Sequence, residues 1–103
     1  NVMVFGFSQG AATASRWVES GRSRADELVL WCGFFPPDLE FKKIPEHVKM
    51  KIVTASEDQF IGPAEEKEML ETQKKLVPSL MHFQFEGGHE INIQAFRKLF
   101  PEE

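Results

Sequence analysis

The stretch GFSQG at residues 6–10 decides the fold, because it lies where a short apolar run ends and a helical run begins. Residues 2–7 are apolar, which predicts a buried strand. Residues 9–19 are rich in alanine and predict a helix, with Gly21 as its stop signal. A Gly-x-Ser-x-Gly sequence between a strand and a helix is typical of a nucleophile elbow, a sharp turn that raises the serine above the sheet.

Such a turn makes steric demands that these residues can meet. We expect Ser8 to have a strained backbone, and we expect side chains at Gly6 and Gly10 to clash where strand and helix cross. The helix N-terminus would point at Ser8 and favour negative charge there, so that the backbone N–H of Gln9 becomes an oxyanion donor. The alternative is that both glycines are ordinary turn residues and that Ser8 is only the helix N-cap.

The remainder of the chain continues the alternation of apolar and helical runs. It predicts an α/β fold, in which a parallel sheet with right-handed crossovers is covered by helices. The predicted strands are residues 2–7, 27–32, 50–55 and 80–85, and the predicted helices are residues 9–19, 63–76 and a last helix after Gly88 that carries Ile91 on its apolar face. The crossover at residues 33–49 contains FFPPDLEF, whose two prolines disfavour a helix at its start.

The composition fits one small domain. The chain has 103 residues, of which 42% are hydrophobic and 27% charged, with a formal net charge of −4. The mild acidity argues against a dedicated nucleic-acid binder, and no apolar run approaches the roughly 20 residues of a membrane span. Cys32 is the single cysteine, and we expect a buried hydrophobic residue there, without a disulfide or a metal. We expect no cofactor, and a cytoplasmic location.

Two further residues with catalytic chemistry follow predicted strands. Asp58 comes after the third strand and His89 after the fourth, and the carboxyl ends of parallel strands meet at one edge of a sheet. The chain order serine, aspartate, histidine is the one expected after a nucleophile elbow. A neutral imidazole at His89 can take the proton of Ser8, while a carboxylate orients the ring. Glu57 is the alternative acid, and Asp58 is alternatively a cap or turn residue.

The other histidines and the tryptophans have simpler interpretations. His47 lies among charged residues and His82 faces away from the apolar side of its strand, so we expect both to be solvated. We expect Trp17 and Trp31 to be packing residues and not platforms for stacking a ligand.

The motifs together resemble a known family. GFSQG with its alanine-rich helix, the Asp58 loop and the sequence GGHEI at residues 87–91 resemble the phospholipase/carboxylesterase family of α/β-hydrolases, which includes acyl-protein thioesterases and small bacterial carboxylesterases. The resemblance runs from the elbow to the last helix. It implies the C-terminal portion of an α/β-hydrolase fold, with Ser8 as nucleophile, Asp58 as acid, His89 as base and Gln9 as oxyanion residue.

Some features depart from that family's pattern. Ala55 stands where the family usually has a glycine, and Gln59 stands where a proline usually follows the aspartate. The family's early strands and the loop with its second oxyanion N–H have no counterpart, and a strand begins directly after Asn1. We therefore interpret residues 1–103 as a partial domain. We expect it to be weakly active or inactive, and poorly folded, unless the missing N-terminal segment or another chain completes the sheet.

The resemblance implies acyl transfer to water through an acyl-serine intermediate. Four apolar residues near strand ends, Phe34, Phe35, Phe60 and Ile61, either line a pocket for a short or medium acyl chain or belong to the core. The substrate would be a small acyl ester or thioester, which the sequence does not distinguish. The alternatives are a related serine hydrolase, such as a peptidase, and a catalytically silent scaffold that uses its exposed sheet edge for association.

Overall fold

The computed structural model describes residues 2–21 and 24–100. Its centre is a sheet of four parallel strands in the order β1-β2-β3-β4. The strands are β1 (Met3–Phe7), β2 (Glu27–Trp31), β3 (Lys49–Ala55) and β4 (Met81–Phe85). The helices are α1 (Gly10–Glu19), α2 (Pro63–Leu76) and α3 (Ile93–Leu99), and a short 3-10 turn, η1, spans Phe41–Lys43. The parallel sheet covered by helices that the sequence predicts is confirmed.

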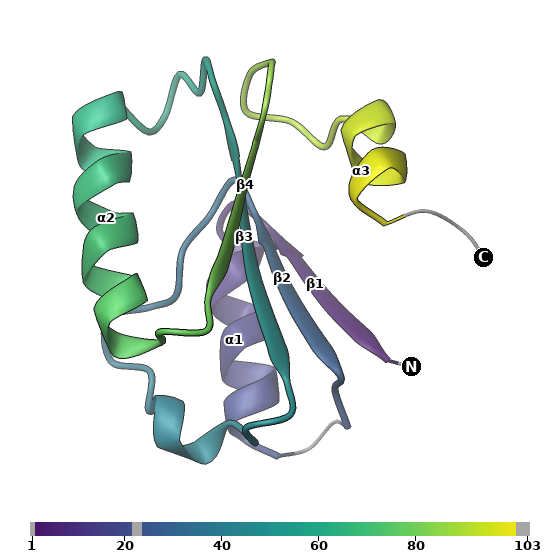
Figure 1. Ribbon diagram of the computed structural model, residues 1–103, viewed down its shortest axis with the longest axis vertical. Helices are drawn as coiled ribbons and strands as arrows, with labels where there is room; N and C mark the ends of the chain where they lie inside the picture. Colours follow the sequence, from purple (N-terminus) through teal and green to yellow (C-terminus); the bar gives the residue numbers. More distant parts are fainter. Residues whose placement is uncertain (1, 22–23, 101–103) are drawn as a thin grey trace.

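The helices lie on both faces of the sheet, α1 and α2 on one face and α3 on the other (Figure 1). Alternation along each strand decides which side chains meet which helices. In β2, Leu28 and Leu30 belong to the apolar cluster of α1 and α2, whereas Val29 and Trp31 belong to the cluster of α3. All four side chains are fully buried, as expected of a strand covered on both faces.

The ends of the elements agree closely with the sequence analysis. Where the sequence predicts bounds, the observed ends differ by at most one residue. The crossover between β2 and β3 forms only η1, so no helix begins at its prolines. The last helix begins later than expected because the side chain of Asn92 caps it by accepting the N–H of Ala95 at 2.9 Å. Ile91 therefore lies before the helix and is exposed, which corrects its predicted place on the apolar face.

Two other side chains differ from their expected surroundings. Trp17 is 49% exposed and lines a shallow groove beside β1, because no element in the described residues covers that edge of the sheet. His82 is exposed as a whole residue, but its Nε2 lies 2.7 Å from Oγ1 of the buried Thr54. Partial burial lowers the pKa of His82, so its ring is not simply solvated. Trp31 is buried and His47 is exposed, as predicted.

The helices are too short for a membrane span. None of those in residues 2–21 and 24–100 combines the length and the apolar character needed to cross a bilayer. The cellular location stays a prediction.

A close crossing of β1 and α1 positions the turn between them. A Cβ added at Gly6 would lie 2.5 Å from the carbonyl oxygen of Gly10, so no side chain fits there. The clash predicted at Gly10 is wrong, since a Cβ added there meets nothing within 4 Å. The second constraint is instead Gly33, where a Cβ would lie 2.7 Å from the carbonyl oxygen of Ser8 and 2.7 Å from the Cβ of Ala11.

Replacing Gly6 by alanine is therefore expected to destabilise the protein, and Gly10→Ala is the matched control. The methyl group at Gly6 meets backbone atoms, and overpacking of this kind costs about 1–3 kcal/mol. At Gly10 the methyl group has free space, and alanine is the better helix former by up to about 1 kcal/mol. Denaturant unfolding measures both free energies of unfolding. Unchanged stability of Gly6→Ala would contradict the close crossing, and a loss at Gly10→Ala would show that a further segment covers the groove.

Candidate active site

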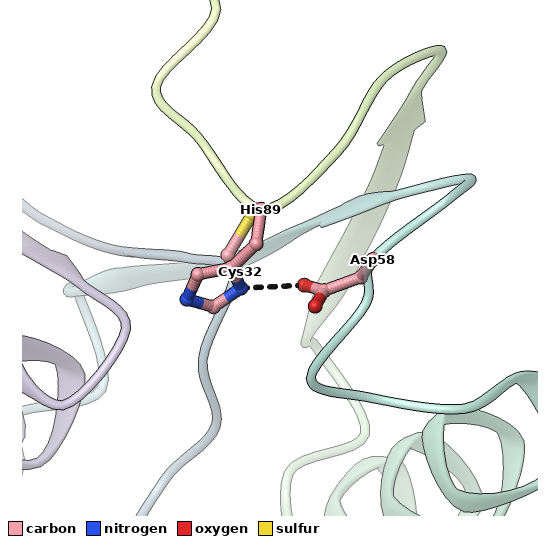
Figure 2. A group of neighbouring side chains, drawn as sticks. All are labelled: Cys32, Asp58 and His89. Carbon is pink, nitrogen blue, oxygen red and sulfur yellow. Dashed lines mark hydrogen bonds and ion pairs between the residues drawn. The ribbon is translucent and has the colours of Figure 1, made fainter.

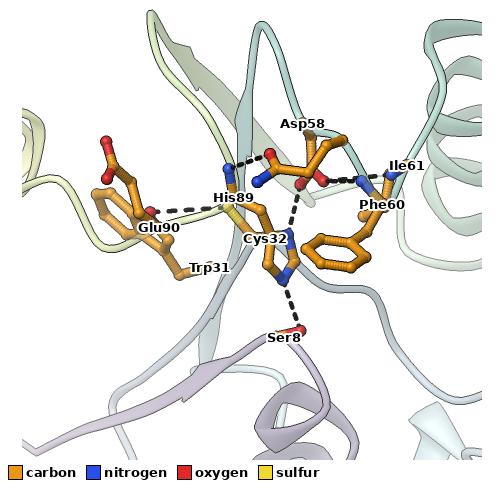
Figure 3. A network of polar contacts seen from close by, with 9 residues as sticks. Ser8, Trp31, Cys32, Asp58, Phe60, Ile61, His89 and Glu90 are labelled. Carbon is orange, nitrogen blue, oxygen red and sulfur yellow. Dashed lines mark hydrogen bonds and ion pairs between the residues drawn. The ribbon is translucent and has the colours of Figure 1, made fainter.

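Ser8 lies at the turn between β1 and α1 in the strained conformation that the elbow motif predicts. Its φ is +56°, in the left-handed region that residues other than glycine seldom adopt. Two backbone hydrogen bonds hold it there. The N–H of Ser8 donates to the carbonyl of Trp31 at 2.9 Å, and its own carbonyl accepts from the N–H of Ala11 at 3.1 Å. The hydroxyl is thereby held at the edge of the sheet, facing His89 (Figure 3).

His89 connects Ser8 and Asp58 in one chain of hydrogen bonds. Its Nδ1 lies 2.7 Å from Oδ2 of Asp58 (Figure 2), and its Nε2 lies 2.7 Å from Oγ of Ser8. The side chains of His89 and Asp58 are only 10% and 3% exposed. The three residues follow β1, β3 and β4, so the fold brings together the serine, acid and base that the sequence predicts. Glu57, the alternative acid, is exposed.

Asp58 is held by its second oxygen as well. Its Oδ1 accepts the backbone N–H groups of Phe60 at 2.8 Å and Ile61 at 3.2 Å, so the turn role considered for Asp58 coexists with its contact to His89. Burial on its own raises the pKa of Asp58. The hydrogen bond from His89 and those from Phe60 and Ile61 outweigh burial, and the pKa is lowered from its usual value. Asp58 is therefore ionised at neutral pH.

The charge of Asp58 fixes the tautomer of His89. An ionised carboxylate can only accept hydrogen bonds, so Nδ1 of the neutral ring must carry the proton. Nε2 then has no hydrogen and accepts the O–H of Ser8. This is the arrangement in which an imidazole acts as a base toward a serine hydroxyl.

Hydrogen bonds connect the loops after β3 and β4 beside Asp58 and His89. The hydroxyl of Ser56 accepts the N–H of Gly87 at 3.2 Å, and Oε1 of Gln59 accepts the N–H of His89 at 3.1 Å. Gln59 can approach because Gly88 has no side chain, since a Cβ there would lie 3.2 Å from Oε1. His89 is therefore positioned by the loop that carries Asp58, through Gln59, which stands where the family resemblance predicts a proline.

Trp31 connects the nucleophile turn to the base loop, a role that the sequence analysis missed. Its carbonyl accepts the N–H of Ser8, and its indole Nε1–H donates to the carbonyl of Glu90 at 2.8 Å. A buried indole usually places its N–H on an acceptor. That rule could have indicated a buried acceptor for Trp31, but it could not have identified which one.

The four predicted pocket residues lie in two different surroundings. Phe60 is 71% exposed and its ring centroid lies 4.8 Å from that of His89. Ile61 is half-buried beside it. Phe35 is only 1% exposed and lines a separate cavity of about 350 Å³ beside α2, whose lining includes none of the other three residues. Phe34 packs against the same core cluster as Phe35. The core alternative thus describes Phe34 and Phe35, and only Phe60 and Ile61 lie next to the acid and base.

The two neighbours of Ser8 in the sequence, Phe7 and Gln9, have different surroundings. The ring of Phe7 lies 5.1 Å from that of His89, a contact that the apolar pattern of β1 did not reveal. Gln9 is the N-cap residue of α1. The first N–H groups of a helix have no acceptor inside it, and the oxyanion role of the backbone N–H of Gln9 stays a prediction.

Residues 2–96 match the family model described as serine hydrolase (FSH1). The chain belongs to the FSH1 serine hydrolase family. The matched range contains the serine, the aspartate and the histidine that the structure brings together. FSH1 membership agrees with the resemblance to carboxylesterase-type α/β-hydrolases found in the sequence. None of the curated proteins matches the chain.

Solved structures show that this FSH1 chain has an α/β-hydrolase fold. An α/β-hydrolase from a Medee basin deep-sea metagenome is 20% identical with a TM-score of 0.64, covering 94% of this chain and 50% of its own. A Bacillus cereus carboxylesterase is 15% identical with a TM-score of 0.62, covering 96% and 47%. A Pyrococcus furiosus esterase is 19% identical with a TM-score of 0.65, covering 97% and 49%. The chain thus spans about half the length of these structures.

Asp58→Asn is expected to lower kcat by about 10³–10⁴-fold in the full-length protein, because an amide cannot hold the required tautomer of His89. Glu57→Gln is the matched control and is expected to change kcat by less than about twofold, as surface substitutions usually do. Steady-state hydrolysis of an activated ester measures both. A larger loss in Glu57→Gln than in Asp58→Asn would assign the acid to Glu57.

Gln59→Ala is expected to lower kcat by about two- to tenfold, because one hydrogen bond to the backbone of His89 is worth about 0.5–1.5 kcal/mol. KM is expected to change little, since Gln59 acts through the base. The control is Gln94→Ala, which alters an exposed glutamine on α3. If both variants keep the full kcat, the side chain of Gln59 does not position His89.

Proposed function

We propose that the protein is a serine carboxylesterase or thioesterase that hydrolyses short or medium acyl esters through an acyl-serine intermediate. One observation carries this proposal: an uninterrupted chain from Ser8 through His89 to an ionised Asp58, with 2.7 Å at each link. Membership of the FSH1 serine hydrolase family supports hydrolase chemistry. The ester or thioester character of the substrate follows from the resemblance to carboxylesterases and is part of the proposal.

The geometry allows the reaction in two halves. Oγ of Ser8 attacks the acyl carbonyl while Nε2 of His89 takes its proton, and Asp58 stabilises the imidazolium that forms. The imidazolium then gives this proton to the leaving alcohol or thiol, which leaves an acyl-serine. In the second half His89 takes a proton from water, and the hydroxide attacks the acyl-serine. The bond between Oγ of Ser8 and the acyl carbon then breaks, the imidazolium returns its proton to Oγ, and the carboxylic acid leaves.

Stabilisation of the oxyanion is the part that this chain supplies incompletely. The backbone N–H of Gln9 is one donor, and loss of a single donor typically costs about 100- to 1,000-fold in rate. We propose that a segment outside these 103 residues adds the second donor and pairs with β1. The groove beside β1, lined by Val4, Phe5 and Trp17 among others, supports this, because it leaves apolar side chains exposed at an open sheet edge. The matched structures are also about twice as long as this chain.

The surroundings of the base favour an apolar acyl group. The rings of Phe7 and Phe60 both lie against His89, and Ile61 is beside them. Apolar side chains with few polar groups are typical of acyl-binding surfaces. The exposed ring of Phe60 is free to cover a bound acyl chain of limited length, which supports short or medium substrates.

A fluorophosphonate probe tests the nucleophile directly. Ser8 is expected to displace fluoride from the probe and retain the phosphonyl group, and Ser8→Ala is expected to abolish both labelling and ester hydrolysis. Ser79→Ala, an exposed serine before β4, is the control and should label like the wild type. The measurements are gel fluorescence of the full-length protein and hydrolysis of p-nitrophenyl esters and matched thioesters of increasing chain length.

Two other outcomes would each favour a different function for the protein. Labelling at Ser8 without hydrolysis of any acyl ester or thioester would favour a related serine hydrolase, such as a peptidase. Absence of labelling in a folded protein would favour the catalytically silent scaffold.

A further inference from the structure

We propose that Cys32, Asp58 and His89 together bind a borderline-soft divalent transition-metal ion such as Zn²⁺, and that the bound ion reversibly inhibits the enzyme. Figure 2 shows the three side chains converging at the carboxyl edge of the sheet. The binding part stands on geometry alone. The inhibition part rests on the proposed function of the same site.

The three ligand atoms are already close together. Sγ of Cys32, a carboxylate oxygen of Asp58 and a ring nitrogen of His89 all lie within 4.8 Å of one another. They come from the loops after β2, β3 and β4, so no spacing rule along the sequence reveals the cluster. The sequence analysis excluded a metal because Cys32 has no ligand-type neighbour in the chain. The fold supplies two such neighbours from other strands.

The donor set selects the metal. One thiolate sulfur, one imidazole nitrogen and one carboxylate oxygen suit Zn²⁺ or Co²⁺, whereas Mg²⁺ and Ca²⁺ prefer oxygen ligands alone. Three protein ligands leave the fourth tetrahedral position for water. Tetrahedral zinc places neighbouring sulfur and nitrogen ligands about 3.6 Å apart, and oxygen and nitrogen about 3.4 Å apart, from its usual bond lengths. The Asp58–His89 contact of 2.7 Å must therefore open by about 0.7 Å, and the sulfur must move closer by up to roughly 1 Å.

The surroundings permit these small shifts. Cys32 is 2% exposed, and its thiol makes a long contact of 3.9 Å with the carbonyl of Glu90, which costs little to break. Asp58 keeps its orientation through the N–H groups of Phe60 and Ile61, which bind the oxygen that does not face His89. The ligands would thus enclose the ion in a buried site with one carboxylate already fixed.

The protons balance in a way that explains inhibition. The Cys32 thiol must lose its proton to bind a metal ion as a thiolate. Metal binding releases that proton to solvent, and Asp58 is already ionised. The proton on Nδ1 of His89 is replaced by the metal and reappears on Nε2, because the neutral ring keeps one N–H. Nε2 then donates toward Ser8 and can no longer accept the serine proton.

Cobalt provides a readout of binding that does not depend on activity. Titration of the full-length protein with Co²⁺ is expected to give a thiolate-to-cobalt charge-transfer band that saturates at one ion per chain. Cys32→Ser is expected to lose the band, whereas Ser8→Ala keeps it because the hydroxyl is not a ligand. Absence of the band in the wild type, or an equal band in Cys32→Ser, would overturn the proposal.

Inhibition is tested with Zn²⁺ and each variant's own metal-free activity as reference. Zn²⁺ at saturating concentration is expected to lower wild-type ester hydrolysis at least tenfold, with recovery after addition of a chelator. Cys32→Ser is expected to change less than twofold. Equal inhibition of the wild type and of Cys32→Ser would show that zinc acts through other groups. Fluorophosphonate labelling without a cobalt band would reject the metal site alone, and a cobalt band without labelling would reject the proposed function alone.

Discussion

The close crossing of β1 and α1 is the constraint on which the rest of the site depends. A Cβ at Gly6 would lie 2.5 Å from a backbone oxygen of the helix, and a Cβ at Gly33 would lie 2.7 Å from the carbonyl oxygen of Ser8. Only glycine permits both approaches, and they allow the turn to hold Ser8 at φ +56°. The hydroxyl is therefore fixed by backbone sterics before any side chain of the site is considered.

Asp58 and His89 form a more local unit. They follow neighbouring parallel strands, and side-chain acceptors on the acid loop bind backbone N–H groups of the base loop, including that of His89. Ser8 follows β1, which β2 separates from β3, and it depends on β2 for its alignment with Asp58 and His89. Trp31 provides that alignment, because its carbonyl holds the backbone of Ser8 while its indole N–H holds the carbonyl of Glu90. One fully buried residue thus sets the distance between the nucleophile turn and the base loop.

The ends of β2, β3 and β4 bring side chains together that are far apart in the sequence. Cys32 is an ordinary buried cysteine when considered with its own strand, yet it lies within 4.8 Å of the ligand atoms of Asp58 and His89. The ionised Asp58 acts on both neighbours: it fixes the tautomer of His89, and its charge helps to raise the pKa of the Cys32 thiol. The proposed catalysis and the proposed metal binding therefore both depend on the surroundings of this one carboxylate.

The sequence by itself determined the order of the elements, the parallel sheet and the edge at which Ser8, Asp58 and His89 meet. It could do so because hydrophobic periodicity and the strand-end rule depend on local spacing and on chain direction. Only the tertiary structure decided that Asp58 and not Glu57 contacts the base, that Phe60 lies at the site while Phe35 is core, and that Gly33 and not Gly10 is sterically constrained. It also revealed Gln59, Trp31 and Cys32 as neighbours of the site. These contacts depend on how loops from different strands fold against one another, and no pattern within a single segment contains that information.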